Sequence, residues 1–378
     1  MHRITKLVCI GAVASLSACS SFFAKEPKNP PATLVEFKPA MAVKTAWSVK
    51  VGSSENYVFS PAEMAGDVLT ASADGTLLRV NAATGHIVWK IKAESSLTAG
   101  VGANATTLAV AGEKGKLFVY DADGKLLWKA QASSDILSAP VIGGGVVVIR
   151  SVDNHIAAYD ALTGVRRWVV ERTLPALTLR SPAGMVINGD NVLVALPGGK
   201  LVALALVNGG LRWEAVVGEP RGATDLERVA DVSGVPVVYG PDVCAIAYQG
   251  RVACFDVKNG TARWSKTLSA DMGVSVDERF VFAASDRGAV SAFSRSAGLS
   301  EWKNEKLAYR QLSAPVSFGR AVAVADASGY VHFLSREDGS FLARASTDGS
   351  AIAATPLVLG SNVVFQTKAG EVVAFAID

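Results

Sequence analysis

Short apolar segments alternate with turns rich in glycine and polar residues along most of the chain. Residues 135–170 show the pattern well, because the segments are rich in β-branched residues and the turns contain Gly, Asp or Asn. The segments cover residues 136–142, 146–150, 156–160 and 166–170, and the turns contain Gly143-Gly144-Gly145, Asp153-Asn154 and Thr163-Gly164. This arrangement predicts four antiparallel strands in succession.

One tryptophan recurs in nearly every such unit. The seven tryptophans of the chain are Trp47, Trp89, Trp128, Trp168, Trp213, Trp264 and Trp302. Six of them follow a glycine by four residues, and Gly339 begins an eighth copy in which Ala343 replaces the tryptophan. A β-rich repeat of about 40 residues is typical of a propeller blade. We expect each indole to pack against the adjacent blade, where its N–H finds an acceptor.

The two ends of the repeat region predict how the ring closes. Residues 371–378 form the third strand of a blade without a fourth, and residues 44–47 form a fourth strand without the preceding three. The N-terminal strand should therefore complete the last blade and remove two open sheet edges. The prediction is an all-β, eight-bladed propeller of four-stranded antiparallel blades over residues 44–378.

Residues 1–18 have the features of an export signal. A basic start is followed by an apolar run too short to span a bilayer, and Leu16-Ser17-Ala18 precedes Cys19. This segment resembles a bacterial lipobox, which implies lipidation of Cys19; an ordinary export signal is the alternative. Ser20, by resemblance to lipoprotein sorting rules, points to the outer membrane. Residues 19–43 then comprise the lipidated cysteine and a flexible tether.

Composition narrows the classes of function. The chain is 50% hydrophobic and 19% charged, and its formal charge of +3 gives no sign of a nucleic-acid partner. None of the four histidines has the spacing of a metal site, and no glycine-rich loop leads from a strand into a helix. We therefore expect neither a metal nor a cofactor.

Cys244 and Cys254 flank one expected hairpin in an oxidising compartment. A three-residue turn would place the two side chains opposite each other, whereas a two-residue turn would place them on opposite faces. The sequence leaves a disulfide and a pair of buried thiols equally open.

The interval of 51 residues between Trp213 and Trp264 is the longest in the series. The additional residues lie in 219–232, where Thr224 and Glu227 form a capping-box pattern. We expect Leu226 and Val229 to share one face of a short helical turn, with Arg228 pointing elsewhere. Such a loop suits a protein-binding site, or it fills the channel or a gap between blades.

The repeats resemble those of quinoprotein-dehydrogenase propellers. The resemblance rests on Tyr120-Asp121, Tyr159-Asp160 and Phe255-Asp256, each followed by Gly-x-x-x-Trp. Enzymes of that group hold pyrroloquinoline quinone over calcium, whereas this sequence has no adjacent cysteine pair and no evident calcium cluster. A periplasmic dehydrogenase of this type is the alternative function.

A narrower resemblance rests on residues 222–232, followed by Pro236-Val237-Val238 and Tyr248-Gln249-Gly250. These segments resemble the BamB family, lipoprotein subunits of the outer-membrane β-barrel assembly machinery. The resemblance implies a non-enzymatic scaffold at the periplasmic face of the outer membrane. Its partners would be the POTRA domains of BamA, with nascent β-barrel proteins as further candidates. The contact residues would be Leu226, Glu227 and Arg228, with Asp231 as their support.

Overall fold

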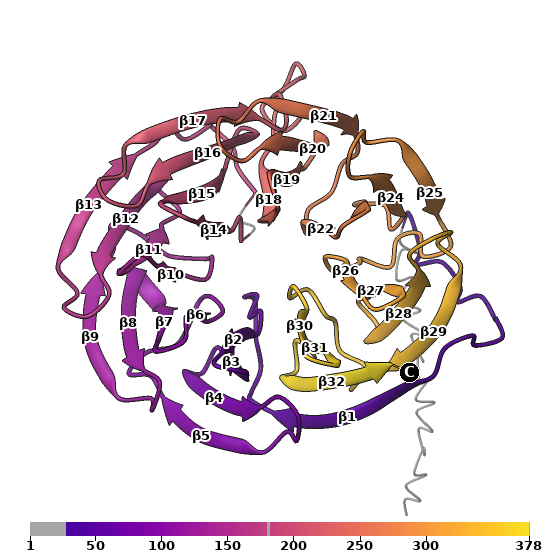
Figure 1. Cartoon of the computed structure of the whole chain (residues 1–378), viewed down its shortest axis with the longest axis horizontal. Helices are drawn as coiled ribbons and strands as arrows, with labels where there is room; N and C mark the ends of the chain where they lie inside the picture. Colours follow the sequence, from indigo (N-terminus) through magenta and orange to yellow (C-terminus); the bar gives the residue numbers. More distant parts are fainter. Residues whose placement is uncertain (1–27, 180–181, 378) are drawn as a thin grey trace, which may run out of the picture. The chain divides into compact units, whose positions relative to one another are not determined.

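The computed structural model describes residues 28–179 and 182–377. In residues 31–377 its strands form eight separate four-stranded sheets, which are arranged as blades around a common centre (Figure 1). Neighbouring strands within every blade are antiparallel. The predicted all-β propeller of eight blades is confirmed.

The first four blades run in chain order from the inner to the outer strand. Their strands are β2 (Ala62–Met64), β3 (Asp67–Ala71), β4 (Thr76–Asn81), β5 (Ile87–Lys92); β6 (Gly102–Ala103), β7 (Thr107–Gly112), β8 (Lys116–Asp121), β9 (Leu126–Gln131); β10 (Val141–Gly143), β11 (Val146–Arg150), β12 (His155–Asp160), β13 (Arg166–Glu171); β14 (Met185–Asn188), β15 (Asn191–Leu196), β16 (Lys200–Ala205), β17 (Leu211–Val216). A 3₁₀ turn, η1 (Glu113–Gly115), joins β7 to β8 and is the only helical element among the described residues.

The remaining blades repeat this order except at the closure of the ring. Their strands are β18 (Val232–Tyr239), β19 (Asp242–Ala247), β20 (Arg251–Asp256), β21 (Ala262–Thr267); β22 (Val274–Val276), β23 (Phe280–Ala284), β24 (Val290–Ser294), β25 (Ser300–Asn304); β26 (Val316–Phe318), β27 (Ala321–Ala325), β28 (Tyr330–Ser335), β29 (Phe341–Ser346); β30 (Leu357–Leu359), β31 (Asn362–Gln366), β32 (Glu371–Ile377), β1 (Val43–Lys50). The N-terminal strand β1 pairs with β32, so the predicted closure is confirmed.

Burial follows position within the blade. The second strand β11 is buried at all five positions, whereas the outer strand β13 buries Trp168 between exposed neighbours. A strand with both faces covered is apolar at nearly every position, whereas buried and exposed residues alternate in a strand with one face in contact with solvent. The apolar core lies between blades, since one cluster joins Leu117 and Trp128 of the second blade to Val147 and Tyr159 of the third.

The inner strands are shorter than the sequence indicated. Residues 136–142 were expected as one strand, but β10 begins only at Val141. Pro140 has no N–H to donate to a ladder, which favours a late start. The preceding residues instead connect two blades: the carbonyl of Ile136 accepts a hydrogen bond from the Thr98 hydroxyl (2.7 Å).

Each indole joins its blade to the next. All seven donate their N–H to a main-chain carbonyl in the neighbouring blade's turn between third and fourth strands, at 2.7–3.1 Å. The Trp128 indole, for example, donates to Ala161 (2.9 Å), and Gly164 in the same turn lies against the ring. The predicted packing of Trp47, Trp89, Trp128, Trp168, Trp213, Trp264 and Trp302 is therefore observed.

The hairpin of β19 and β20 brings the cysteines together. Cys244 lies directly opposite Cys254, since residues 248–250 form a three-residue turn. The two sulfur atoms are bonded as a disulfide. This resolves the choice that the sequence left open.

Residues 31–41 do not form a free tether. They pack along the outside of the blades that contain β25 and β29 before the chain enters β1 (Figure 1). Ala32 donates its N–H to Ala308 (2.8 Å), and Phe37 stacks on Phe341 with ring centroids 5.3 Å apart. We call residues 31–41 the strap. The flexible segment expected over 19–43 is therefore shorter by this length, and its residues 19–27 lie outside the described part.

Strand alternation defines two faces of the ring. Because neighbouring strands are antiparallel, the connections between blades emerge on the same face as the turns between second and third strands. We call this the loop face; it includes residues 217–231 and 248–250. The opposite face, which we call the turn face, includes the turns between third and fourth strands, such as residues 161–165.

Candidate protein-binding site

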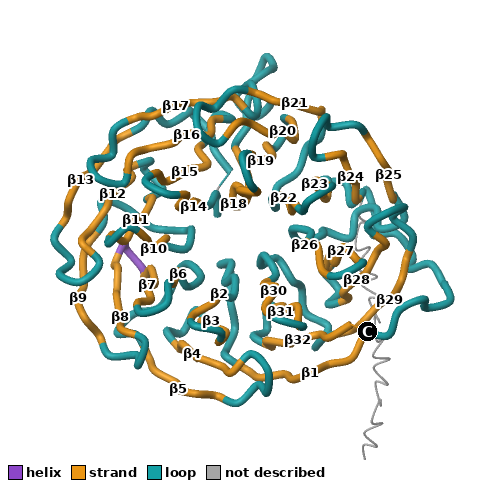
Figure 2. The backbone as a smooth tube through the Cα atoms, in the orientation of Figure 1, coloured by secondary structure: helices purple, strands orange, loops and turns teal. Residues whose placement is uncertain are grey.

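The connection from β17 to β18, residues 217–231, carries a short turn at its tip (Figure 2). The Thr224 hydroxyl accepts the N–H of Glu227 (3.3 Å), and the Glu227 carboxylate accepts the N–H groups of Ala223 (2.9 Å) and Thr224 (3.0 Å). This reciprocal arrangement is the predicted capping box. The hydrogen bond from the Thr224 N–H, with that from Ala223, holds the pKa of Glu227 below its usual value.

The tip presents one apolar and one basic side chain. Leu226 is 71% exposed. Arg228 donates from Nε to the carbonyl of Gly222 (3.0 Å) and from Nη2 to that of Ala223 (3.3 Å), while its side chain stays half exposed. The guanidinium therefore stiffens the loop from outside, and the leucine is available for a partner.

Val229 does not share a face of the turn with Leu226, contrary to the expectation from the sequence. It is only 5% exposed, and Ala230 after it is 1% exposed. The reason is that the turn is short: the chain already heads into the buried start of β18 at this point. The exposed tip of Leu226 is also not what a channel plug or a gap filler would present.

Asp231 ties three segments of the loop face together. Its carboxylate accepts the N–H of Leu179 (2.6 Å) from the preceding inter-blade connection and the N–H of Gly198 (2.9 Å) from the turn before β16. Its carbonyl accepts the N–H of Tyr248 (2.9 Å). The side chain is 2% exposed, so Asp231 supports the site from beneath and does not present itself to a partner.

A buried arginine balances this carboxylate. Burial raises the pKa of Asp231, whereas the two N–H donors and the charge of Arg150 lower it. Burial also lowers the pKa of Arg150 to about 10, against the opposing effect of Asp231. Arg150 Nη2 donates to the carbonyl of Ala183 (3.4 Å), so the pair connects the third, fourth and fifth blades beneath the site.

The connection from β13 to β14 belongs to the same surface, and the sequence analysis missed it. Leu174 and Leu177 are 44% and 47% exposed there. The N–H of Leu179 is hydrogen-bonded to the Asp231 carboxylate at the end of the β17–β18 loop. A signal was present, because the interval from Trp168 to Trp213 is the second longest in the series. Exposed leucines from adjacent connections make an apolar surface suited to a protein partner.

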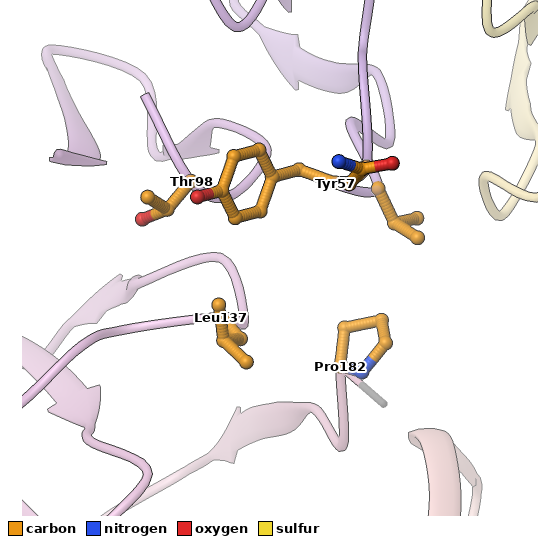
Figure 3. A pocket seen from close by; sticks show the side chains of 6 residues that line it. Tyr57, Thr98, Leu137 and Pro182 are labelled. Atoms are coloured by element: carbon orange, nitrogen blue, oxygen red, sulfur yellow. The ribbon is translucent and has the colours of Figure 1, made fainter. Parts of the chain in front are cut away.

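A cavity of about 280 Å³ opens near these connections, where the chain enters several inner strands (Figure 3). Tyr57 and Thr98 lie on one side of it, and Leu137 and Pro182 lie on the other. Its lining is mixed: Val58, Leu137 and Pro182 are apolar, and Asn56, Tyr57 and Thr98 contribute polar groups.

The described residues offer neither a metal site nor a membrane-spanning helix. Within 28–179 and 182–377, no group of three or more His, Cys, Asp and Glu side chains could hold a metal ion. In the same residues no helix is long and apolar enough to cross a membrane. Cys19, the expected lipidation site, lies outside the described part of the chain.

The fold and its repeats define an eight-bladed propeller of the pyrroloquinoline-quinone repeat class. A solved quinohemoprotein alcohol dehydrogenase from Comamonas testosteroni shares this fold, with a TM-score of 0.68 at 14% identity over 88% of this chain and 76% of that chain. At that identity the likeness is one of fold alone.

A family model described as outer membrane protein assembly factor BamB matches residues 73–304. The Bordetella pertussis protein of that name is 42% identical over 97% of this chain and 95% of its own length. The crystal structure of BamB from Moraxella catarrhalis has a TM-score of 0.81 at 27% identity and covers 89% of this chain and 100% of that chain. The chain belongs to the BamB family. The predicted family is thus confirmed. With the quinoprotein dehydrogenases, the alternative, the chain shares only the fold.

Proposed function

We propose that this protein is a non-enzymatic scaffold that assists the assembly of β-barrel proteins in the outer membrane. Its relatives carry the name of outer membrane assembly factors, and they match it over nearly their whole length. The lipobox-like segment before Cys19 places it, in this proposal, as a lipid-anchored protein at the periplasmic face. The mechanism is binding and orientation of partners.

The binding surface comprises Leu226, Glu227 and Arg228, with Leu174 and Leu177 beside them and Asp231 beneath. Its partner in this proposal is the POTRA region of BamA. The observation that carries the proposal is the exposed Leu226 on a turn made rigid by its own hydrogen bonds. A rigid apolar anchor loses little conformational entropy when it binds.

The test is copurification from detergent-solubilised membranes with affinity-tagged protein. A Leu226→Ala, Arg228→Ala variant should retain the melting temperature of the wild type and lose BamA. The matched control is Leu162→Ala, Arg166→Ala, because Leu162 is 77% exposed on the turn face. The control should copurify BamA as the wild type does.

Purified POTRA domains then give the magnitude. We expect Leu226→Ala to weaken binding by about 1–2 kcal/mol, and Arg228→Ala by about 1–3 kcal/mol. Part of the arginine effect comes from lost loop order, since its guanidinium holds Gly222 and Ala223. Equal binding by wild type and both loop variants would exclude this surface, and failure of the wild type to capture BamA would exclude the partner.

A further inference from the structure

The strap crosses the outside of the ring from one face to the other. Its N-terminal end lies at the loop face, where Ala32 donates to Ala308 in the connection from β25 to β26 (2.8 Å). Its C-terminal end lies at the turn face, where the carbonyl of Ala40 accepts a hydrogen bond from Arg320 Nη2 (2.7 Å) in the turn after β26. The chain then enters β1 at Val43 on the turn face, opposite Ile377.

Aromatic and aliphatic side chains seat the strap. Phe37 stacks on Phe341, and the Arg344 guanidinium lies 5.1 Å from the centroid of the Phe37 ring. Leu34 and Val35 pack against the apolar cluster of the adjacent blades. The strap is therefore held over several residues, and its contacts do not depend on one anchor.

Two arginines of the propeller hold the strap backbone from beneath. Arg310 Nη1 donates to the carbonyl of Ala32 (2.9 Å), and Arg344 Nη2 donates to that of Val35 (3.1 Å). Hydrogen bonds from charged donors are stronger than neutral ones.

A buried pair, Asp326 and His332, holds both guanidinium groups. Asp326 accepts Arg310 Nε (2.6 Å) and lies 3.0 Å from His332 Nε2, and Arg344 Nε lies 3.2 Å from His332 Nδ1. Asp326 and His332 are fully buried. These contacts hold both guanidinium groups in the positions from which they donate to the strap backbone.

We propose that the strap is a latch: by binding the outside of the propeller, it makes the tether to the lipid-anchored Cys19 begin on the loop face. Without it, the tether would begin at Val43 on the turn face, and about 24 residues would separate it from Cys19. With it, the tether begins at Pro31 on the loop face. The face that bears the β17–β18 loop then turns toward the lipid surface. This inference rests on the proposed lipid anchor at Cys19.

The latch also shortens the reach of the propeller from the membrane. The stretch of about 11 residues from Ser20 to Pro30 can reach at most ~40 Å, whereas about 24 residues can reach at most ~80 Å. The partner surface is therefore confined to a layer close to the bilayer.

The first test measures the latch itself, by hydrogen exchange of the full-length protein. The amides of Ala32 and Ala40 donate to the propeller and should exchange at least about tenfold more slowly than in an unfolded chain. A Leu34→Ala, Phe37→Ala variant should lose this protection while the blades keep theirs. Lys38→Ala is the control, because this side chain is exposed.

The second test measures orientation in vesicles of phosphatidylethanolamine and phosphatidylglycerol that contain an acceptor-labelled lipid. Full-length protein, exported with its own residues 1–18 and purified from membranes, carries a fluorescent donor at Ser328→Cys on the loop face or at Ser296→Cys on the turn face. Both positions are exposed. Energy transfer should be at least about twofold higher from residue 328. The Leu34→Ala, Phe37→Ala variant should abolish or reverse this difference, and Lys38→Ala should preserve it.

Each outcome decides a separate point. Fast exchange of the strap amides in the wild type would overturn the latch. Protected amides with equal transfer from both labels would overturn the orientation. Absence of transfer from either label would refute the lipid anchor and the orientation with it, while the exchange data would still decide the latch.

Discussion

Adding a methyl group at Gly164 tests how the blades are locked together. Gly164 has φ of +73°, and a Cβ there would lie 2.6 Å from Cδ2 and 2.8 Å from Cε3 of Trp128. Gly189 is a matched control, because its φ is +56° and a Cβ would meet nothing within 4 Å. Both substitutions place alanine in the left-handed region, and only one of them drives it into an indole.

The two costs can be separated. Left-handed backbone costs alanine about 1–2 kcal/mol, and overpacking of a filled site adds about 1–3 kcal/mol. We therefore expect Gly189→Ala to lower the free energy of unfolding by about 1 kcal/mol and Gly164→Ala by about 3 kcal/mol. Trp128→Ala removes the ring and its hydrogen bond to Ala161, at a cost of about 3–5 kcal/mol.

The double variant identifies the cause. In the Trp128→Ala background the space beside Gly164 is open, so Gly164→Ala should cost only about 1 kcal/mol. The assay is urea denaturation followed by far-ultraviolet circular dichroism, which does not depend on tryptophan fluorescence. Two results would refute the packing of Gly164 against Trp128. One is that Gly164→Ala and Gly189→Ala lower the free energy of unfolding equally. The other is that Gly164→Ala lowers it as much in the Trp128→Ala background as in the wild type.

Two further predictions concern buried chemistry. Burial lowers the pKa of His332, against the opposing effect of Asp326. The unfolded chain therefore binds a proton at His332 more readily than the folded protein does. The contribution of neutral His332 to the free energy of unfolding is complete above pH about 6.5 and is lost as the pH falls below that value. The melting temperature should thus fall more steeply from pH 7.5 to pH 5.5 in the wild type than in His332→Asn, and parallel slopes would contradict this. The Cys244–Cys254 disulfide closes a short loop, so its reduction should lower the free energy of unfolding of the wild type by about 2–3 kcal/mol. The same reducing conditions should leave a Cys244→Ala, Cys254→Ala variant unchanged. Two titratable thiols in the unfolded, unreduced protein would exclude the disulfide.

The blades could be predicted because their signals are local. A second strand such as β11 has both faces covered and is apolar at its first four positions, and the turn after it needs residues that tolerate unusual backbone angles. The bounds 146–150 therefore agreed with the structure. The prediction for inner strands such as β10 was wrong because apolar residues at the inner edge of a blade also serve as inter-blade connections.

The site was only half predictable for the same reason. The capping box at Thr224 and Glu227 is a local pattern, and it was found in the structure. The link from Asp231 to Leu179 spans 52 residues and depends on how two blades stand beside each other. No local pattern in the sequence specifies such a contact.

The sequence of the strap predicts a tether, because it lacks periodicity. Its order comes from groups elsewhere: two arginines and an aromatic ring on the propeller determine where Ala32, Val35 and Phe37 lie. A segment without a periodic pattern can thus be ordered by its contacts with the surface on which it packs.

The missing eighth tryptophan and the strap have one explanation. Every indole donates to a carbonyl in the neighbouring turn between third and fourth strands. The last blade has no such turn, because its third strand is β32 and its fourth is β1. An indole at Ala343 would find no carbonyl of that kind, and the strap covers this position instead: Ala40 and Met41 both donate to the carbonyl of Leu342. The repeat without a tryptophan therefore precedes the blade in which the ring closes, and the strap, which leads into β1, covers the position of the missing indole.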